Sequence, residues 1–533
     1  MKMSDVPSLI DTDIVEKRNY QKEIFESIKN EDSLVVLPTG LGKTIIAIYL
    51  ICHRLEEGKR ALIMAPSRPL CKQHMDLLID ITGLERKDVE LVTGELYSPK
   101  QRKSIWAKDY RVFIATPQVV NNDLHQLPIR SLGLFVFDEV HRATGDYAYT
   151  EIARACRNKV QFLGMTASPG SSFESLVQVC YNLDIDHIEV REESDEDVRP
   201  YVSDRSIEWT EIEKSEPVRE LESLLDKMLD HFLTELGDYS KRAKNLKLDS
   251  IGKSTLVDIQ KNLQKRIKDE SKGYLFHALS LTSACIKASH LKELLLTQGI
   301  DASYRYYLKI LDDESRSSKY IVKRDEFDEV GDRLIDLKAM PVETDPKLEK
   351  TRELLRNRSM DGNVMVFARY RDTGDHLVKE LDRMEDIYPA KLIGQSDKNG
   401  DKGMSQEEQK DTLRKFEDHD KNVLVSTSIG EEGLDIPSTD LVIFYEPVPS
   451  AIRYIQRKGR TGRNNQPGKV HILLTKDSKD EIFHWKSMKE EKRVYEHVYR
   501  LKEKLEKADD TSRFLEKLMD EEIEGQKRLE NYG

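Results

Sequence analysis

Cysteine is scarce in this sequence, and the spacing of the cysteines matches no metal site. Five cysteines are spread over 533 residues, the count is odd, and no CxxC pair occurs. Cysteine-based zinc sites and disulfide frameworks both depend on paired cysteines, so neither is expected here. The cysteines are expected to be reduced thiols, most of them buried as small apolar side chains.

Long hydrophobic runs are also missing. The most apolar stretch, Thr44–Cys52, is followed at once by His53 and Arg54, whereas a membrane-spanning helix needs about 20 apolar residues. The opening segment MKMSDVPSLIDTD lacks the apolar core of a secretory signal. We therefore expect a cytoplasmic location and no membrane partner.

A surplus of positive charge is absent too. The chain has 85 Lys and Arg against 97 Asp and Glu, which gives a net charge of -12. This total excludes a protein coated by one basic surface for nucleic acid. It is compatible with a local basic track, because binding depends on the nearby field. The charged content of 34% indicates large wet surfaces, and the length predicts about three domains.

The sequence does contain a repeated alternation of short β-rich runs and amphipathic stretches. This alternation predicts parallel, doubly wound sheets of the α/β class. In the first block the expected strands are Ser33–Leu37, Ala61–Ala65, Val112–Ala115, Leu134–Phe137 and Val160–Met165. In a second block they are Val364–Phe367, Val423–Ser426 and Leu441–Tyr445. The blocks echo one another weakly (RVFIATPQ and NVLVSTSI), which suggests two copies of one unit with a ligand cleft between them.

Between the two blocks the pattern is helical. The segment Lys241–Lys272 is rich in Lys and Arg, which is typical either of a solvated helix face or of a surface that contacts phosphates. The tail after Phe483 is helical and highly charged, and it is either a packing helix or a frayed end. The expected division is a first α/β domain over 1–200, a helical insert over 216–338, a second α/β domain over 201–215 and 339–480, and a tail over 481–533.

The first motif that carries chemistry is a phosphate-binding loop. It follows an expected strand, opens an expected helix, and consists of Pro38, Thr39, Gly40, Leu41, Gly42, Lys43 and Thr44. Backbone N–H groups in such a loop surround phosphate oxygens, and the helix N-terminus favours negative charge. Lys43 is placed to reach the β- and γ-phosphates, and Thr44 to bind Mg²⁺. The strict pattern has Gly where Leu37 stands, but two glycines still supply the turn. The expected cofactors are ATP and Mg²⁺.

The second motif, Asp138-Glu139-Val140-His141, ends the apolar run Leu134–Phe137. A carboxylate at a strand end can hold Mg²⁺, which assigns Asp138 to the metal beside Thr44. The adjacent Glu139 is placed to orient or deprotonate the attacking water. Alone, this pattern is also compatible with an acidic loop, but the phosphate loop upstream favours catalysis.

The third motif is the run Gln456–Arg463, which reads QRKGRTGR in the second block. Arginines that reach a γ-phosphate across a cleft stabilise the charge of the transition state. The alternative is a basic surface helix. Arginines on one unit and a phosphate loop on the other would make hydrolysis depend on closure of the cleft, which is how an ATPase becomes a motor.

The order of the motifs resembles superfamily 2 helicases over roughly residues 15–480. The motifs PTGLGKT, PSRPL, TPQ, DEVH, TAS, VFARYRDT, STSIGEEGLDIP and QRKGRTGR follow one another as in that superfamily. The stretches FDEVHRATGDYAY (Phe137–Tyr149) and GQSDKNGDKGMSQEEQ (Gly394–Gln409) resemble the Hef/FANCM branch, whose archaeal members act on forked DNA. RIG-I-like and Dicer helicases are close relatives with the same kind of insert. The resemblance implies two tandem RecA-like motor domains with an all-helical insert.

The resemblance also implies roles at the nucleotide. Arg18 and Gln21 would hold the adenine, and His141 would couple the ATP site to the nucleic acid together with Thr166 and Ser168. On the second motor domain, the residues facing the nucleotide would be Gly433, Asp435, Gln456, Arg460 and Arg463.

Further residues would contact the sugar–phosphate backbone, and such contacts position a strand without reading its bases. The resemblance assigns this role to Ser67, Arg68, Thr116, Gln118, Arg369 and Thr427. For Ser67, Thr116 and Thr427, ordinary capping at a strand end is the alternative.

One departure from the branch bears on partners. Many Hef and FANCM relatives continue into a nuclease domain and helix-hairpin-helix motifs, and no nuclease core is expected in the residues after the second block. The segment Glu85-Arg86-Lys87-Asp88 echoes a nuclease signature, but it lies inside the first block and is interpreted as coincidence. Cleavage is expected from a separate nuclease, and a replication-clamp protein is a further candidate partner.

Three functions remain as hypotheses. The first is an ATP-dependent DNA helicase or translocase acting on forked or branched DNA in repair or replication-fork processing. In it, phosphate contacts would also come from Lys261, Lys265, Arg266 and Lys268 of the insert. The second is a duplex-RNA-stimulated ATPase of the RIG-I/Dicer kind, against which no RNA-end-binding module is visible. The third is a nucleotide-gated binding scaffold without turnover, which the intact Lys43 and Glu139 disfavour.

Overall fold

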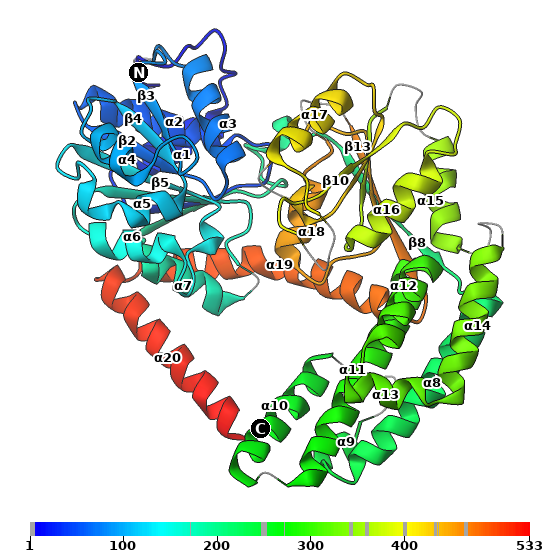
Figure 1. The fold of residues 1–533 in the computed structure, drawn as a ribbon. Helices are drawn as coiled ribbons and strands as arrows, with labels where there is room; N and C mark the ends of the chain where they lie inside the picture. Colours follow the sequence, from blue (N-terminus) through cyan, green and yellow to red (C-terminus); the bar gives the residue numbers. More distant parts are fainter. Residues whose placement is uncertain are drawn as a thin grey trace.

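The computed structural model describes residues 6–170, 172–246, 253–270, 272–340, 345–357, 362–397, 402–430, 434, 436–462 and 467–532, with side chains up to residue 521. Within these residues the chain forms two parallel β-sheets, a helical insert and two long C-terminal helices (Figure 1). This is the expected α/β architecture of two motor domains with an all-helical insert.

The first sheet has seven parallel strands in the order β3-β4-β2-β5-β6-β1-β7. Its central strands are apolar and buried, as expected when helices cover both faces. The strands are β1 Ser33–Val36, β2 Arg60–Met64, β3 Val89–Val92, β4 Val112–Ala115, β5 Leu132–Asp138, β6 Gln161–Thr166 and β7 His187–Val190. The five strands expected from the sequence are present, and the two edge strands β3 and β7 were not predicted.

Two layers of helices enclose this sheet (Figure 1). One layer packs α1, α2 and α3 through a core that includes Ile24, Ile48 and Met75, and the other packs α4–α7 through a core that includes Trp106 and Tyr149. The helices are α1 Asn19–Ile28, α2 Lys43–Glu56, α3 Arg68–Asp80, α4 Pro99–Trp106, α5 Pro117–Asn122, α6 Ala148–Cys156 and α7 Phe173–Leu183, with 3-10 turns η1 Leu124–Gln126, η2 Val140–Arg142 and η3 Arg199–Tyr201. Because all strands run the same way, their carboxyl ends share one edge, where ligands bind in such folds.

The second sheet has six parallel strands in the order β10-β11-β9-β12-β13-β8. The chain enters it through β8 before the insert and returns to it afterwards, and β8 pairs with β13 along its whole length. The strands are β8 Arg205–Ile212, β9 Val364–Phe367, β10 Pro389–Leu392, β11 Val423–Ser426, β12 Leu441–Phe444 and β13 Gly468–Thr475. The surrounding elements are α15 Pro346–Arg356, α16 Arg371–Leu381, α17 Gln406–Glu417, η6 Ser428–Gly430 and α18 Ala451–Lys458.

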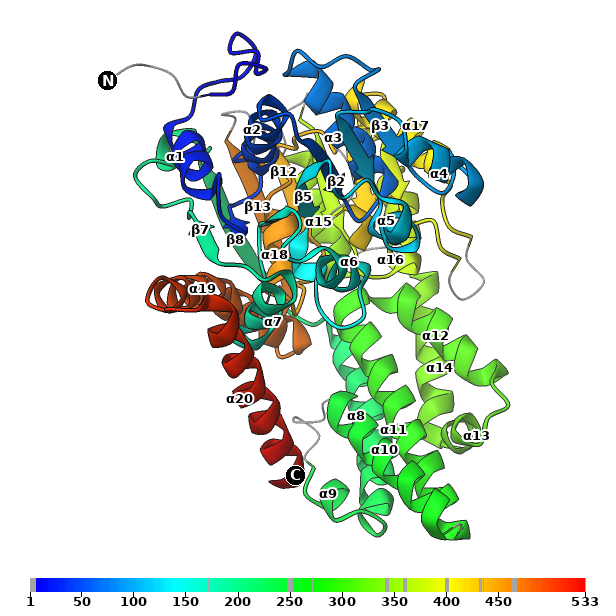
Figure 2. The same ribbon diagram turned by 90° about the vertical axis from the view of Figure 1, so that its left-hand side faces the viewer.

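The insert is a separate helical bundle that projects from the two sheets (Figure 2). It has its own core, which includes Leu225, Phe232, Leu281 and Phe327. Its helices are α8 Glu216–Gly237, α9 Lys241–Lys244, α10 Lys253–Glu270, α11 Gly273–Gln298, α12 Ile300–Asp312, α13 Arg316–Val322 and α14 Asp325–Ala339. A core of its own is typical of a unit that folds separately from its neighbours.

The tail consists of α19 Lys479–Glu506 and α20 Thr511–Tyr532. Helix α19 contacts β7 and α7 of the first domain as well as β13 and α18 of the second, and α20 contacts α7. Val498, Leu501 and Leu515 are buried in the core of the first domain. The packing-helix interpretation of the tail is therefore confirmed for α19 and for the start of α20.

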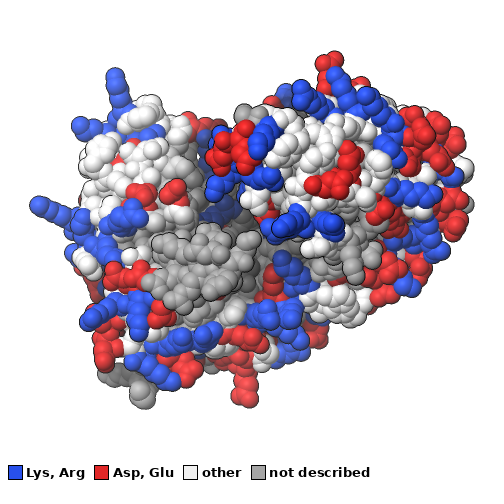
Figure 3. All heavy atoms as spheres, turned by 90° about the horizontal axis from the view of Figure 1, so that it is seen from below, with Lys and Arg blue, Asp and Glu red and all other residues white. Residues whose placement is uncertain are grey.

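The remaining bulk features agree with the sequence. All five cysteines are buried free thiols, and burial raises the pKa of Cys52, Cys71 and Cys285 to about 12. No helix in the described part of the chain is both long and apolar enough to cross a membrane. On the face that Figure 3 shows, Lys and Arg are interspersed with Asp and Glu.

Candidate nucleotide site and interdomain cleft

The phosphate loop lies between the end of β1 and the start of α2. Gly40 and Gly42 have φ angles of 84° and 78°, a left-handed conformation that glycine adopts without steric cost. Lys43 Nζ donates to the carbonyl oxygen of Leu37 at 2.9 Å, so the ammonium group lies over the loop. The loop thus presents backbone N–H groups and one cation at a helix N-terminus, which suits a phosphate.

The adenine candidates Arg18 and Gln21 lie at the start of α1, which is hydrogen-bonded to this loop. The Tyr20 hydroxyl donates to the Leu41 carbonyl at 2.7 Å, and Gln21 Nε2 donates to the same carbonyl at 3.1 Å. Gln21 Oε1 is buried and accepts no hydrogen bond from any described group, so it suits the exocyclic amine of an adenine. The guanidinium of Arg18 lies 5.0 Å from the ring centroid of Tyr201.

The acidic pair stands at the carboxyl end of β5. Asp138 Oδ2 lies 2.8 Å from Nε2 of the buried His74, and Asp138 Oδ1 accepts the backbone N–H of Glu139 at 3.0 Å. Burial disfavours charge on Asp138, but His74 and the ammonium of Lys43 outweigh burial and lower the pKa of the carboxyl group. The backbone of Glu139 has a φ of 49°, which is unusual for a residue other than glycine. The carboxylate of Asp138 is therefore held charged and faces the phosphate loop.

His141, Thr166 and Ser168 meet beside the acidic pair. His141 Nδ1 lies 3.2 Å from Thr166 Oγ1 and 3.3 Å from Glu139 Oε2. Thr166 Oγ1 accepts the backbone N–H of Ser168 at 3.1 Å. Thr166 ends β6, the strand between β5 and β1, and its carbonyl accepts the N–H of Leu37. A continuous chain of polar contacts thus joins the acidic pair to the phosphate loop.

The donor set at this edge fits Mg²⁺. Asp138 supplies a charged carboxylate, and Thr44 places a hydroxyl on the first turn of α2. Among the described residues no group of three or more His, Cys, Asp or Glu could hold a metal alone. Mg²⁺ commonly takes only one or two protein ligands and completes its shell with water and substrate phosphates. The site therefore suits a metal that arrives with a nucleotide.

The other half of the site belongs to the second domain. Gln456 and Arg460 are 6% and 7% exposed, and Arg460 Nη1 donates to the Leu434 carbonyl at 3.2 Å. A methyl group on Gly459 would lie 1.9 Å from Oγ1 of Thr39, so the end of α18 touches the phosphate loop across the domain boundary. The candidates Gly433, Asp435 and Arg463 lie outside the described residues.

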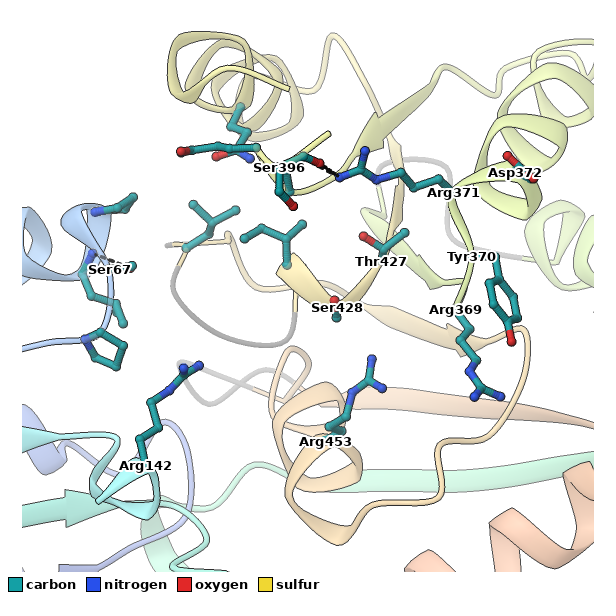
Figure 4. Close-up of a pocket in the computed structure, with 18 of the residues that line it drawn as sticks. Ser67, Arg142, Arg369, Tyr370, Arg371, Asp372, Ser396, Thr427, Ser428 and Arg453 are labelled. Atoms are coloured by element: carbon teal, nitrogen blue, oxygen red, sulfur yellow. Dashed lines mark hydrogen bonds between the residues drawn. The ribbon is translucent and has the colours of Figure 1, made fainter. Parts of the chain in front are cut away.

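A cavity of about 790 Å³ opens between the two domains and the insert (Figure 4). Ser67, Arg369 and Thr427, three of the six backbone candidates, line it, whereas Arg68, Thr116 and Gln118 do not. Ser67 Oγ also accepts the N–H of Leu70 as the cap of α3, so the capping alternative holds for that residue. The cavity wall also includes Arg142, Lys253, His290, Lys309, Arg371 and Arg453.

The insert meets this cavity through other residues than those expected. The four candidates Lys261, Lys265, Arg266 and Lys268 are exposed on α10, whose buried side is formed by Leu256, Ile259 and Leu263. The insert residues in the cavity wall are Lys253, His290 and Lys309. Lys253 belongs to the basic segment Lys241–Lys272 that was expected to contact phosphates or solvent. Sequence reasoning missed His290, Lys309 and His74, because each becomes significant only through contacts with distant parts of the chain.

Three family models match consecutive parts of the chain. The DEAD/DEAH box helicase model matches residues 18–176, and the helicase conserved C-terminal domain matches residues 346–465. Between them, the helical bundle described as a putative ATP-dependent RNA helicase matches residues 217–340. The three matches follow the order of the first sheet, the insert and the second sheet.

Relatives match over nearly the whole chain. A putative ATP-dependent RNA helicase of Methanocaldococcus jannaschii is 36% identical over 91% of this chain and 61% of its own length. The ATP-dependent DNA helicase mph1 of Neurospora crassa is 33% identical over 87% of this chain and 41% of its own length. The chain thus spans less than two thirds of these curated relatives. The crystal structure of the Pyrococcus furiosus Hef helicase domain has a TM-score of 0.69 at 37% identity, over 90% of this chain and 100% of that one.

Two parallel-sheet domains that bring a phosphate loop, an acidic strand end and an arginine-rich helix together define the motor core of a superfamily 2 helicase. The helical insert, and a match that covers the whole Hef helicase domain, assign the chain to one branch of this superfamily. This chain belongs to the Hef/FANCM branch of superfamily 2.

Proposed function

We propose that the chain is an ATP-driven helicase or translocase that acts on branched or forked DNA. The observation that carries this proposal is that both motor domains and the insert wall one cavity, while the nucleotide site also spans both motor domains. Relatives named ATP-dependent DNA helicase support DNA as the substrate. A substrate bound by both motor domains and the insert would be moved when the cleft between the motor domains closes, as a motor requires.

The chemistry at the nucleotide would be phosphoryl transfer to water. Mg²⁺, held by Asp138 and Thr44, would supply positive charge at the β- and γ-phosphates. Lys43 binds the same phosphates, Glu139 orients and deprotonates the attacking water, and Arg460 enters from the second domain to stabilise the developing charge. Because these groups sit on two domains, hydrolysis requires the domains to meet, as they do at Gly459 and Thr39.

The proposed division assigns residues 1–200 to the first motor domain, and residues 201–215 together with 339–480 to the second. Residues 216–338 form the insert, and residues 481–533 form the tail. The pairing of β8 with β13 supports the discontinuous second domain. The insert is the candidate element for substrate choice, since it supplies part of the cavity wall and also the exposed cations of α10. A separate nuclease and a replication-clamp protein are the proposed partners for cleavage and recruitment, in the cytoplasm.

Duplex RNA is the second candidate substrate. One relative is named a putative ATP-dependent RNA helicase, and the model that matches the insert carries the same description. A contact that depends on the 2′-hydroxyl would favour RNA. The cavity wall offers charged and hydroxyl groups that suit the backbone of either nucleic acid, so the choice is decided by experiment.

The proposal is tested by a panel of substrates in one ATPase assay. Forked DNA, linear duplex DNA, single-stranded DNA and duplex RNA of equal length are compared at one salt concentration. We expect forked DNA to give the highest rate and the lowest half-saturating concentration. Equal stimulation by duplex RNA and forked DNA would reject the DNA preference, and the absence of ATP turnover with every substrate would favour a binding scaffold.

A further inference from the structure

Two arginines without an assigned role reach the cavity from opposite motor domains. Arg142 is the last residue of η2, on the first domain, and Arg453 lies on α18, on the second. Both line the cavity, and Figure 4 shows their guanidinium groups directed into it from two sides, with Ser428 and Thr427 on the side of Arg453. Neither residue is among the backbone contacts that the resemblance implies.

Each arginine is attached to the nucleotide machinery of its own domain. Arg142 directly follows His141, which contacts Glu139 and Thr166. Arg453 lies one helical turn before Gln456 and Arg457 on α18. Arg457 is fully buried, with its guanidinium 4.7 Å from the ring centroid of Phe367, so α18 is held firmly against the second sheet. A shift of the backbone at either arginine would therefore also shift residues of the ATP site.

The chemistry of the cavity wall identifies the ligand. The hydroxyls of Ser67, Thr427 and Ser428 are hydrogen-bond donors, and Asp372 is the single acid among the described residues of the wall. The cations of the wall are Arg142, Lys253, Lys309, Arg369, Arg371 and Arg453. Guanidinium groups and hydroxyls together suit an oxyanion with several acceptor oxygens, and a phosphodiester is such a group.

We propose that Arg142 and Arg453 bind the same backbone phosphate of the nucleic acid and thereby clamp the two motor domains together. This inference rests on the proposed function, because it takes the cavity as the path of a nucleic-acid strand. A phosphate held from both sides stabilises the closed arrangement in which Gly459 meets Thr39. A nucleotide that favours closure should therefore raise the affinity for the strand. By thermodynamic linkage, the strand should raise the affinity for the nucleotide by the same factor.

The test measures strand affinity for Arg142→Gln, Arg453→Gln and the double variant, with and without a non-hydrolysable ATP analogue. In the wild type the analogue tightens binding. We expect each single variant to lose about 10-fold or more in affinity with the analogue, the order expected for one charge-assisted contact. The double variant is expected to be scarcely weaker than either single variant, because each change already destroys the shared site.

Control variants and chemically modified strands make the test specific to the two arginines and to one phosphate. Arg154→Gln and Arg414→Gln remove exposed arginines outside the cavity, one from each motor domain, and should bind as the wild type does. Arg142→Lys and Arg453→Lys keep the charge and should recover part of the affinity. In strands with one neutral methylphosphonate at successive positions, at least one position should weaken binding by the wild type and have no further effect on the double variant.

The possible outcomes distinguish a failure of this inference from a failure of the proposed function. Losses that simply add in the double variant, or variants that respond to the analogue as the wild type does, would overturn the shared phosphate while leaving the motor intact. A wild type that binds no nucleic acid and shows no stimulated ATPase would instead overturn the proposed function.

Discussion

Gly459, at the end of α18, lies so close to Thr39 of the phosphate loop that a methyl group on Gly459 would come within 1.9 Å of Thr39 Oγ1 and 2.8 Å of Thr39 Cβ. The two residues belong to different motor domains and are separated by the whole insert in the sequence. Their contact shows the two halves of the nucleotide site in direct apposition. Closure of the cleft therefore depends on the absence of a side chain at Gly459.

The first prediction follows from this contact. Gly459→Ala should lower the nucleic-acid-stimulated kcat by about 10- to 100-fold, because a displacement of roughly 1 Å between catalytic groups can cost that much. Strand binding without nucleotide should change little. Steady-state ATPase assays at saturating strand and ATP test this expectation.

Two companion variants make the interpretation specific. Thr39→Gly combined with Gly459→Ala removes both close atoms and should restore part of the lost rate. Gly94→Ala adds a methyl group where no described atom lies within 4 Å and should act as the wild type does. A wild-type kcat in Gly459→Ala would show that the domains do not approach this closely during turnover.

His74 provides the second prediction. Its Nε2 lies 2.8 Å from Oδ2 of Asp138, and both side chains are buried. Loss of a partner that orients a metal ligand typically lowers metal affinity by about 10- to 100-fold. His74→Leu should therefore raise the Mg²⁺ concentration for half-maximal ATPase activity by that order.

A conservative variant is the control for His74. His74→Gln retains an N–H donor and should need less Mg²⁺ than His74→Leu. If the Mg²⁺ dependence of both variants matched that of the wild type, His74 would be a packing residue without influence on the metal.

The third prediction concerns the attacking water. Glu139→Gln retains the size of the side chain but removes its ability to accept a proton, so kcat should fall by about 100-fold or more. Strand binding in the presence of ATP should survive. Parallel measurements of turnover and strand affinity test this separation, and unchanged turnover would remove Glu139 from the catalytic groups.

The fourth prediction concerns the exposed cations of α10. Replacing Lys261, Lys265, Arg266 and Lys268 by Gln should weaken strand binding and flatten its salt dependence. For each phosphate that the variant no longer neutralises, the log–log slope should become shallower by about 0.7 to 0.9. Binding titrations over a range of salt concentrations give this slope. An unchanged slope would identify this side of α10 as merely solvated.

A matched set of cations controls for the change in total charge. Four exposed cations of the first domain that do not line the cavity serve as this set: Lys100, Lys103, Lys108 and Arg130. Their replacement by Gln should leave the salt slope close to that of the wild type.

The sequence was most informative where a function depends on consecutive residues. Strand, glycine turn, Lys43 and helix follow one another directly, so the phosphate loop could be predicted from a short window. The acidic strand end at Asp138 is equally local. The central strands were predictable for the same reason, because they are short apolar runs that are buried on both faces.

The missed features depend on distant contacts. Strand β8 reads RSIEWTEI and is largely exposed at a sheet edge, so its polar composition concealed it. His74 becomes significant only because α3 brings it against the end of β5. Arg142 and Arg453 acquire a common role only when two domains and the insert enclose one cavity. No local pattern encodes such contacts, since they depend on how separately folded units pack together.

The central claim is that nucleotide and nucleic acid are bound across the same pair of domains, and the rate of ATP hydrolysis as a function of forked-DNA concentration tests it most directly. We expect a low basal rate that rises by about 10-fold or more and saturates, since closure assembles groups that otherwise lie on separate domains. In Gly459→Ala this rise should be largely lost. A wild-type rate that is already maximal without nucleic acid, or that stays constant as forked DNA is added, would contradict the account.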